Sequence, residues 1–301
     1  MTLVQLKYAV VLDKIRNFAL AAQELYIAQP TLSLQIQKLE KELGILLFDR
    51  STSPISTTPE GKEIIKQARI VLQEAEKLEY MFSQKDGNVS GEIQLGIIPT
   101  ISSFLLVKLL PVLQNNYPDL KIKIFEMPTN QIVQKLESNE IDLGILATPL
   151  ANKKIKEIPL YYEPFTIYLP PSQKIKKDEI PLEDIHEMEI ILLGEEHCFR
   201  GQTLKICKNS GFGRIEAGSF ETIKKLVDNN LGLTLLPLFE EVTSRDRVKK
   251  IKPPVPAREV SFVTNHFFFK TKILNAIKSE ILKLVPKEYH SKKDFQIIGI
   301  D

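Results

Sequence analysis

The two cysteines of the chain lie in one short segment that could carry out thiol redox chemistry. Cys198 and Cys207 stand nine positions apart in the run HCFRGQTLKIC, which begins at His197. The thiolate is the form of cysteine that reacts with oxidants, and the neighbouring His197 and Arg200 would lower the pKa of Cys198 if their side chains turned toward it. A peroxide converts such a thiolate to a sulfenic acid, which a second thiol can capture as a disulfide. Cys207 is the only other cysteine in the sequence.

Other interpretations of the cysteine pair stay open at this point. Free cysteine is often buried as a small apolar residue, so both thiols could be inert core groups. A metal site is not expected, because two thiols and His197, without the close paired spacing of structural zinc sites, leave a ligand missing. No cofactor is expected either. His186, His266 and His290 have no partner pattern and are interpreted as surface or packing residues.

The composition is that of a soluble globular protein. The chain has 301 residues, 40 basic and 38 acidic side chains and 43% hydrophobic residues, enough for about two domains of roughly 100–200 residues each. No apolar run reaches the roughly 18 residues that span a bilayer, and Asp13, Lys14 and Arg16 interrupt the apolar core that a signal peptide would need. We therefore expect a cytoplasmic protein with no membrane partner. The net charge of +2 is too small to indicate a nucleic-acid partner without a motif.

Residues 1–57 have the spacing of short helices that cross sharply. Leu3, Leu6, Ala9 and Leu12 form one apolar stripe, and a second helix follows Asn17. Only about residues 26–28 separate it from a third helix, whose first turn accommodates Pro30. Apolar residues recur along the third helix in steps of three and four, and Gly44 ends it; these residues are Leu32, Ile36, Leu39 and Leu43. Small and amide side chains remain on its outer face, as in a helix-turn-helix that enters a DNA groove. A helical hairpin with a merely soluble polar face is the alternative.

The stretch AAQELYIAQPTLSLQIQKLEKELGILLFDR, which ends at Arg50, resembles the winged helix-turn-helix of LysR-type transcriptional regulators. The resemblance continues through Thr57, Thr58 and Gly61 and then covers essentially the whole chain. It implies a DNA-binding domain over residues 1–57, in which Arg50 and the wing, residues 51–57, contact phosphate groups or the minor groove. The residues that it implies for DNA contact are Gln29, Pro30, Thr31, Ser33, Gln35 and Arg50.

Residues 58–87 are predicted to form a long helix that pairs with a second copy of the chain. Thr58-Pro59-Glu60 is a favourable helix start. An apolar stripe then continues for more than twenty residues through Ile64, Ala68, Val71, Ala75, Leu78 and Phe82. A two-helix coiled coil would bury it, and the resembled family has its linker helix here. The alternative is that the helix packs this apolar stripe against its own domain. GNVSG at 87–91 marks the end of this element.

Residues 91–301 alternate strand and helix patterns, which predicts parallel sheet covered by helices on both faces. Two lobes, about 92–163 with 265–301 and about 164–264, resemble the periplasmic-binding-protein-like effector domain of the same regulators. The predicted fold class is therefore α/β, with a winged helix-turn-helix, a linker helix and a two-lobed effector domain. Thr100, Ser102 and Ser103 lie where the first strand meets a helix, a place that can hold a small polar ligand or anion.

The cysteine segment narrows the resemblance to the hydrogen-peroxide-sensing branch of the family, because HCxRxQxLxxC is similar to the redox segment of that branch. The resemblance implies that Cys198 is the peroxidatic thiol and Cys207 the resolving thiol. It assigns electrostatic support to His197 and Arg200. Two further residues, Thr100 and Thr129, fall where that branch positions peroxide. Members of that branch often have an arginine in the region that corresponds to TNHFFFKTK. This chain has no arginine there, and Lys270 and Lys272 are interpreted as its substitutes.

The leading hypothesis is a DNA-binding transcription activator, not an enzyme, that hydrogen peroxide switches through a Cys198–Cys207 disulfide. Its expected partners are operator DNA, a second copy joined through the linker helix, a dimer of dimers, and RNA polymerase. The first alternative is a LysR-type regulator of a small organic anion bound between the lobes. The second is a thiol peroxidase, and a solute-binding protein is weaker still. The final FQIIGI is open to interpretation as an added strand or as a docking tail.

Overall fold

A computed structural model describes residues 1–83, 88–185, 189–207 and 212–300 of the chain. The chain divides into two compact units, one of Met1–Gly87 and one of Asn88–Glu137 with Ile141–Asp301. Within the described residues, no helix has both the length and the apolar character needed to cross a membrane. The same residues hold no group of three or more His, Cys, Asp and Glu side chains arranged to bind a metal ion. Each unit is built around its own apolar core.

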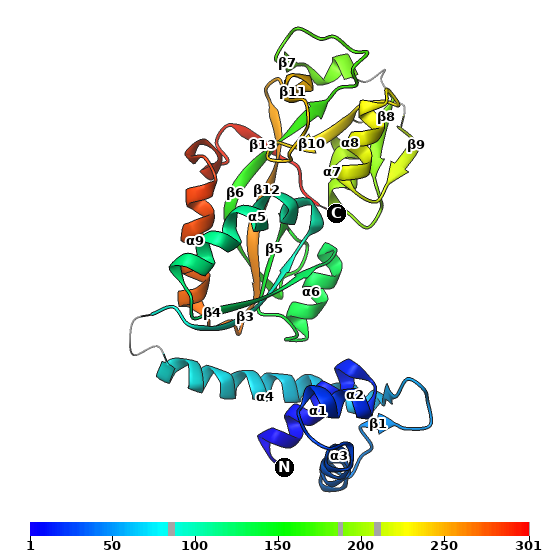
Figure 1. Cartoon of the computed structure of the whole chain (residues 1–301), viewed down its shortest axis with the longest axis vertical. Helices are drawn as coiled ribbons and strands as arrows, with labels where there is room; N and C mark the ends of the chain where they lie inside the picture. The colour runs from blue at the N-terminus through cyan, green and yellow to red at the C-terminus, as the bar shows by residue number, and fades with distance from the viewer. Residues whose placement is uncertain (84–87, 186–188, 208–211, 301) are drawn as a thin grey trace. The chain divides into compact units, whose positions relative to one another are not determined.

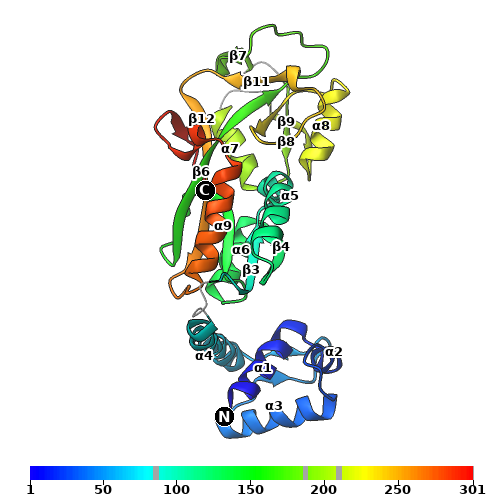
Figure 2. The same ribbon diagram turned by 60° about the vertical axis from the view of Figure 1, so that its left-hand side comes forward.

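The first unit contains the predicted short helices and the wing. Its elements are α1 (Leu3–Ile15), α2 (Phe18–Glu24), α3 (Gln29–Leu43), β1 (Phe48–Asp49), β2 (Ser56–Thr57) and α4 (Pro59–Ser83). Thr2 forms a capping box with Gln5, Asn17 caps α2, and Gly44 closes α3 at φ 73°. The strands β1 and β2 pair antiparallel. Figures 1 and 2 show α1 between α3 and α4, which leaves one side of α3 uncovered.

The helix α4 has a buried half and an exposed half. Near its start, Thr58 accepts a hydrogen bond from the Gly61 N–H at 2.9 Å, and Ile65 and Ala68 are buried in the core of the first unit. Further along, large apolar side chains lie at the surface, with 61% of Leu78 and 69% of Phe82 exposed. The helix ends at Ser83 within the described residues, and the 84–87 part of the predicted linker lies outside them.

The first lobe of the second unit is built on a sheet of parallel strands. Its elements are β3 (Gly91–Ile97), α5 (Pro99–Asn116), β4 (Leu120–Glu126), α6 (Thr129–Glu137), β5 (Leu143–Thr148), α9 (Thr271–Leu284) and β13 (Phe295–Ile297). The central strand β3 pairs parallel with both β4 and β5. The helices α5 and α9 contact each other over the sheet, whereas α6 packs on β5. Figure 2 shows this layering.

The second lobe carries the cysteine segment. Its elements are β7 (Glu179–Ile180), β8 (Ile190–Leu193), α7 (Cys198–Ile206), β9 (Phe212–Ala217), α8 (Phe220–Asp228), β10 (Thr234–Pro237) and β11 (Val248–Ile251), with short 3₁₀ turns at Leu182–Ile185, Arg245–Arg247 and Lys287–His290. The strands β8 and β9 pair parallel, and α7 and α8 pack against β8. The apolar core of this lobe includes Phe199, Ile206 and Cys207.

Two long antiparallel strands run through both lobes, which the predicted parallel pattern did not include. They are β6 (Ile155–Tyr168) and β12 (Val255–Asn265), and they pair from Ile155 opposite Asn265 to Pro164 opposite Ala257. The segment EVSFVT was placed in the second lobe, but its residues pair with β5 in the first. The prediction was wrong here because β12 is long enough to enter the first lobe well before residue 264.

Candidate functional site

Cys198 lies at the first position of α7, where backbone N–H groups are free of helical partners. The turn after β8 leads into this helix, and His197 is its N-cap residue. The backbone N–H groups of Cys198 and Phe199 both lower the pKa of the Cys198 thiol, as expected at the positive end of a helix dipole. Cys198 is partly exposed and lines a cavity.

Arg258 is the cation of this site, and hydrogen bonds to Glu163 and Thr100 fix its position. It stands on β12 directly opposite Glu163 on β6, and only 1% of it is exposed. Its Nε and Nη2 donate to Glu163 Oε2 at 2.9 and 2.7 Å. Its Nη1 and Nη2 donate to the Thr100 hydroxyl at 2.8 Å and to the Thr100 carbonyl at 2.7 Å. The guanidinium also lies over the Phe199 ring, 5.4 Å from its centroid, within the roughly 6 Å of a cation–π contact.

The ionisation of Cys198 is set by opposing influences. Burial raises the pKa of the thiol and has the largest effect, so the pKa lies above its ordinary value. The positive charge of Arg258 and the nearby Thr129 hydroxyl lower the pKa and partly offset the burial. The Thr129 hydroxyl is itself buried and has no hydrogen-bond partner among the described residues. An approaching polar molecule therefore meets one available hydroxyl beside the sulfur.

Cys207 lies at the opposite end of α7 in a different environment. It is the C-cap residue of the helix and is 0% exposed within the apolar core of the second lobe. Burial raises its pKa to about 12. Both cysteines are free thiols. Nine helical steps at about 1.5 Å separate their Cα atoms by roughly 13 Å, far beyond the roughly 4.4–6.8 Å that a disulfide requires.

The structure places Arg200 away from the role that the sequence analysis gave it. Its guanidinium bonds to Glu216 at 2.5 Å and lies 3.7 Å from Glu195, so its charge is held by carboxylates. His197 Nε2 lies 3.2 Å from the Gly218 carbonyl. Arg258, rather than Arg200, is the cation that lowers the pKa of Cys198.

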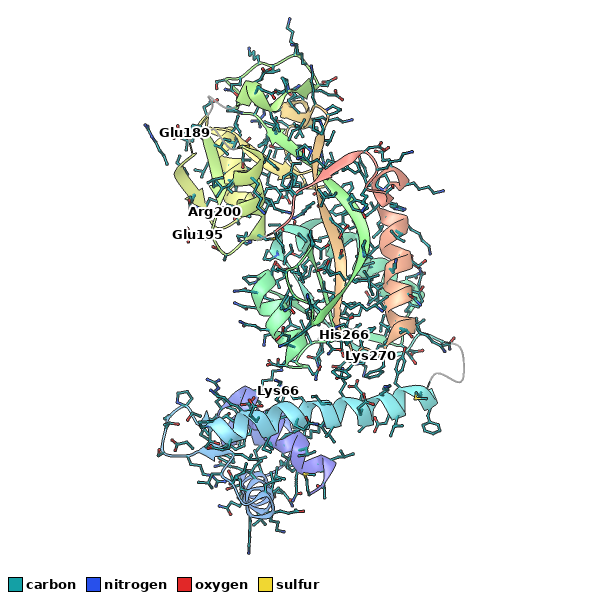
Figure 3. All side chains as sticks on the ribbon, turned by 180° about the vertical axis from the view of Figure 1, so that it is seen from behind. Lys66, Glu189, Glu195, Arg200, His266 and Lys270 are labelled. Atoms are coloured by element: carbon teal, nitrogen blue, oxygen red, sulfur yellow. The ribbon has the colours of Figure 1, made fainter. Side chains whose placement is uncertain are left out.

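The lysine substitutes also lie elsewhere. Lys270 Nζ bonds to the Glu92 carbonyl at 3.0 Å and pairs with Asp142 at 3.0 Å, at the start of β3. Figure 3 shows Lys270 near His266 in the first lobe and Arg200 beside Glu195 in the second. The sequence analysis noted that an arginine is absent from the 264–272 region; Arg258, which lies earlier on β12, is the arginine that acts on Cys198.

Two cavities are lined by residues of this site. The first, about 310 Å³, is lined by Thr100, Ser103, His197, Ser219 and Lys224. In it Lys224 is paired with buried Glu240 at 2.7 Å, and Ser103 bonds the same carboxylate at 3.2 Å. The second, about 690 Å³, is lined by Thr129, Asn130, Leu150, Glu195, Cys198 and Ile300. The predicted site residues are thus divided, with Thr100 and His197 on one cavity and Thr129 and Cys198 on the other.

The residues predicted to contact DNA occupy the uncovered side of α3 and the wing. Gln29, Pro30 and Thr31 are exposed at its N-terminal turn. Gln35 accepts a hydrogen bond from Gln5 at 3.1 Å, and Ser33 accepts one from Arg50 at 3.5 Å.

Arg50 is positioned by a carboxylate that the sequence analysis missed. Its Nη2 donates to Glu40 at 3.0 Å, and its guanidinium stacks on Phe18 at 5.1 Å. Glu40 is 6% exposed and also accepts from the backbone N–H groups of Leu47 and Phe48, at 2.9 and 3.2 Å. This carboxylate connects α3 to the start of the wing and holds the guanidinium of Arg50.

Two family models match the chain. Residues 3–62 match the bacterial regulatory helix-turn-helix protein, lysR family, and residues 86–278 match the LysR substrate binding domain. The chain therefore belongs to the LysR family of transcription regulators. The predicted family and fold class are confirmed.

Two relatives show which members of that family the chain is similar to. The chain is 32% identical over 271 residues to a hydrogen peroxide-inducible genes activator of Haemophilus influenzae, covering 87% of this chain and 90% of the relative. It is 33% identical over 272 residues to the DNA-binding transcriptional dual regulator OxyR of Escherichia coli, covering 87% and 89%.

Solved OxyR structures have the same fold. A full-length cysteine-to-aspartate variant of OxyR from Pseudomonas aeruginosa aligns with a TM-score of 0.81 at 32% identity, covering 93% of this chain and 94% of that chain. A hydrogen-peroxide-bound cysteine-to-serine variant of OxyR from Corynebacterium glutamicum aligns with a TM-score of 0.62 at 26% identity, covering 94% and 92%.

Proposed function

We propose that this LysR-family regulator is a transcription activator that hydrogen peroxide switches through a Cys198–Cys207 disulfide. One observation carries the proposal: Cys198 stands at the N-terminus of α7 beside Arg258 and Thr129, and the second cysteine ends the same helix. The name of the Haemophilus influenzae relative supports it, since it describes an activator of hydrogen peroxide-inducible genes.

The first chemical step uses the groups around Cys198. The Cys198 thiolate attacks one peroxide oxygen, so that an S–O bond forms and the O–O bond breaks. The sulfur is oxidised to sulfenic acid, and the leaving hydroxide takes a proton to become water. Arg258 stabilises the thiolate, and the Thr129 hydroxyl is placed to bond the peroxide. We assign a peroxide-positioning role to Thr100 as well, through its two hydrogen bonds with Arg258.

The second step joins the two cysteines and requires α7 to unwind. The Cys207 thiolate attacks the sulfenic sulfur of Cys198, an S–S bond forms, and hydroxide leaves to become a second water. Because the Cα atoms must approach by at least about 6 Å, the helix between them cannot persist. Cys207 must also leave the apolar core in which its pKa is about 12. The oxidised and reduced forms then differ in the packing of the second lobe.

We propose that residues 1–57 bind DNA and that residues 58–87 join two copies of the chain. The exposed apolar side chains of α4 support the second part, because Leu78 and Phe82 would be covered by a second α4. Two copies of α3 would then meet successive major grooves of a two-fold related site. A dimer of dimers and a contact with RNA polymerase extend this proposal.

The second candidate is a regulator that responds to a small organic anion. The 310 Å³ cavity supports it through the hydroxyls of Ser103 and Ser219 near two helix N-termini, whereas the Lys224 ammonium in the same cavity is paired with Glu240. In that case the cysteines would have no signalling role. A thiol peroxidase is the remaining candidate from a different class.

Thiol counting separates these candidates. Reduced protein is treated with one equivalent of hydrogen peroxide, and free thiols and DNA footprints are measured before and after. The proposal requires loss of both thiols and a changed footprint in the wild type. Cys198→Ser should abolish the response, whereas Cys207→Ser should leave a trappable sulfenic acid at Cys198. Two retained thiols with an unchanged footprint would support the organic-anion candidate, and sustained turnover with a reductant would support a peroxidase.

A further inference from the structure

The residues that follow β13 lie against the helix that carries Cys198. The strand β13 pairs parallel with the start of β12, and the Ile298 N–H donates to the Ala257 carbonyl at 2.9 Å. Beyond this point the Gln202 side-chain amide donates to the Ile298 carbonyl at 2.6 Å, and Lys205 Nζ donates to the Gly299 carbonyl at 2.9 Å. Figure 1 shows the C-terminal end beside α7. The FQIIGI stretch is therefore both an added strand and a docked segment.

Residues 298–300 lie against α7, in the surroundings of both cysteines. Gln202 and Lys205 are three positions apart on α7 and so share one helix face. Gln202 is 0% exposed, so its side-chain amide donates to Ile298 from a buried position. The Ile298 side chain packs against the core that holds Cys207, and Ile300 lines the cavity that holds Cys198.

We propose that Gln202 and Lys205 are positioning residues for the redox reaction. Their hydrogen bonds to the 298–300 segment stabilise the helical dithiol form of α7 and thereby set how readily the Cys198–Cys207 disulfide forms. This inference rests on the proposed function, because it concerns the same disulfide.

The argument follows from where the two donors stand. Both lie between the cysteines, in the segment that must unwind before the disulfide closes. When helical geometry is lost, the two side chains no longer share a face, and they cannot bond to adjacent carbonyls of a strand-anchored segment. The anchor remains because β13 is held by β12 and not by α7. The dithiol form has these hydrogen bonds and the disulfide form lacks them, so removing them favours the disulfide.

A redox titration tests this inference. Full-length wild type and the Gln202→Leu/Lys205→Met double variant are equilibrated with reduced and oxidised glutathione, and the disulfide fraction is measured by alkylation and mass spectrometry. We expect the equilibrium constant of the double variant to shift about tenfold toward the disulfide, the factor that corresponds to about 1.4 kcal/mol. Lys225→Met is the matched control, because Lys225 lies on α8 in the same lobe and its ammonium pairs with Glu221. Its constant should remain that of the wild type.

Further variants keep the inference testable. Ending the chain after Ile297 removes both carbonyl acceptors and should produce the same tenfold shift. Lys205→Met alone should shift the constant about threefold, which supplies the measurement if the double variant does not fold. A double variant within twofold of the wild type, or an equal shift in Lys225→Met, would overturn the positioning role. A wild type that forms no Cys198–Cys207 disulfide would instead refute the proposed function.

Discussion

The charge of Arg258 is expected to control how fast peroxide oxidises Cys198. The perturbation is Arg258→Met combined with Glu163→Gln, because Arg258→Met alone would leave the buried Glu163 carboxylate without its partner. Since the positive charge of Arg258 lowers the pKa of Cys198, its removal should raise that pKa.

The expected change in rate is smaller than the change in thiolate population. Near neutral pH the thiolate fraction would fall by about tenfold for each unit by which the pKa rises. Thiolate nucleophilicity rises with pKa with a Brønsted coefficient of about 0.4–0.5, which restores part of the loss. The two effects together predict a reaction with hydrogen peroxide that is roughly 3- to 4-fold slower at neutral pH for each unit by which the pKa rises.

The assay is the stopped-flow rate of Cys198 oxidation across about pH 6 to 10, measured in a Cys207→Ser background so that one thiol reacts. The midpoint of the pH profile should move to higher pH in the Arg258→Met/Glu163→Gln variant. Glu163→Gln alone keeps the guanidinium and removes the carboxylate that neutralises it, so its midpoint should move to lower pH. A double variant with the wild-type midpoint would refute the reasoning, because no charge would then have acted on the sulfur.

Three further outcomes follow from other parts of the chain. Leu78→Glu should dissociate the dimer in sedimentation equilibrium, because a carboxylate in a helix seam is unfavourable, whereas Lys77→Gln should leave the mass unchanged; a Leu78→Glu dimer would contradict the role of α4. Glu40→Gln should lower the free energy of unfolding in urea by about 1–3 kcal/mol, because buried N–H donors lose a charged acceptor; an unchanged midpoint would contradict this. Because the pKa of Cys207 is raised from 9.0 to about 12 in the folded protein, the folded state holds its proton longer than the unfolded chain does. Stability should therefore fall as pH rises through this window, by about 1.4 kcal/mol per pH unit, and Cys207→Ala should lessen the fall measured by urea unfolding at about pH 8 and 9.5; equal losses in both proteins would exclude Cys207 as the cause.

The sequence predicted those parts of the fold that are determined by residues close together in the chain. The helices of the first unit follow from apolar spacing and from local caps such as Asn17 and Gly44. The cysteine pair was found for the same reason, because both thiols belong to one short helix. The long strands were divided wrongly between the lobes, since period-two patterning shows that a strand exists but not which neighbours it pairs with.

The central residue of the site was missed because its contacts are distant in the chain. Arg258 bonds to Thr100 across 158 positions and to Glu163 across 95. In the sequence, Arg258 and Glu259 stand together in a strand pattern and so resemble a solvated face. Burial of a charge requires a partner, but a single sequence does not indicate which acidic residue that partner is. Glu40 was missed in the same way, as an ordinary charge on a helix.

The pairing of β6 with β12 restricts how the two lobes can move. Sliding one strand along the other while each side chain keeps its face needs a shift of two residues, roughly 7 Å. Such a shift would separate Arg258 from Glu163, which are opposite each other in the present register. A gradual translation between the lobes is therefore unfavourable, and twisting or bending of the strand pair is the motion that remains. The register shift between Val260 and Ser261 interrupts the regular ladder and is the natural place for such a bend.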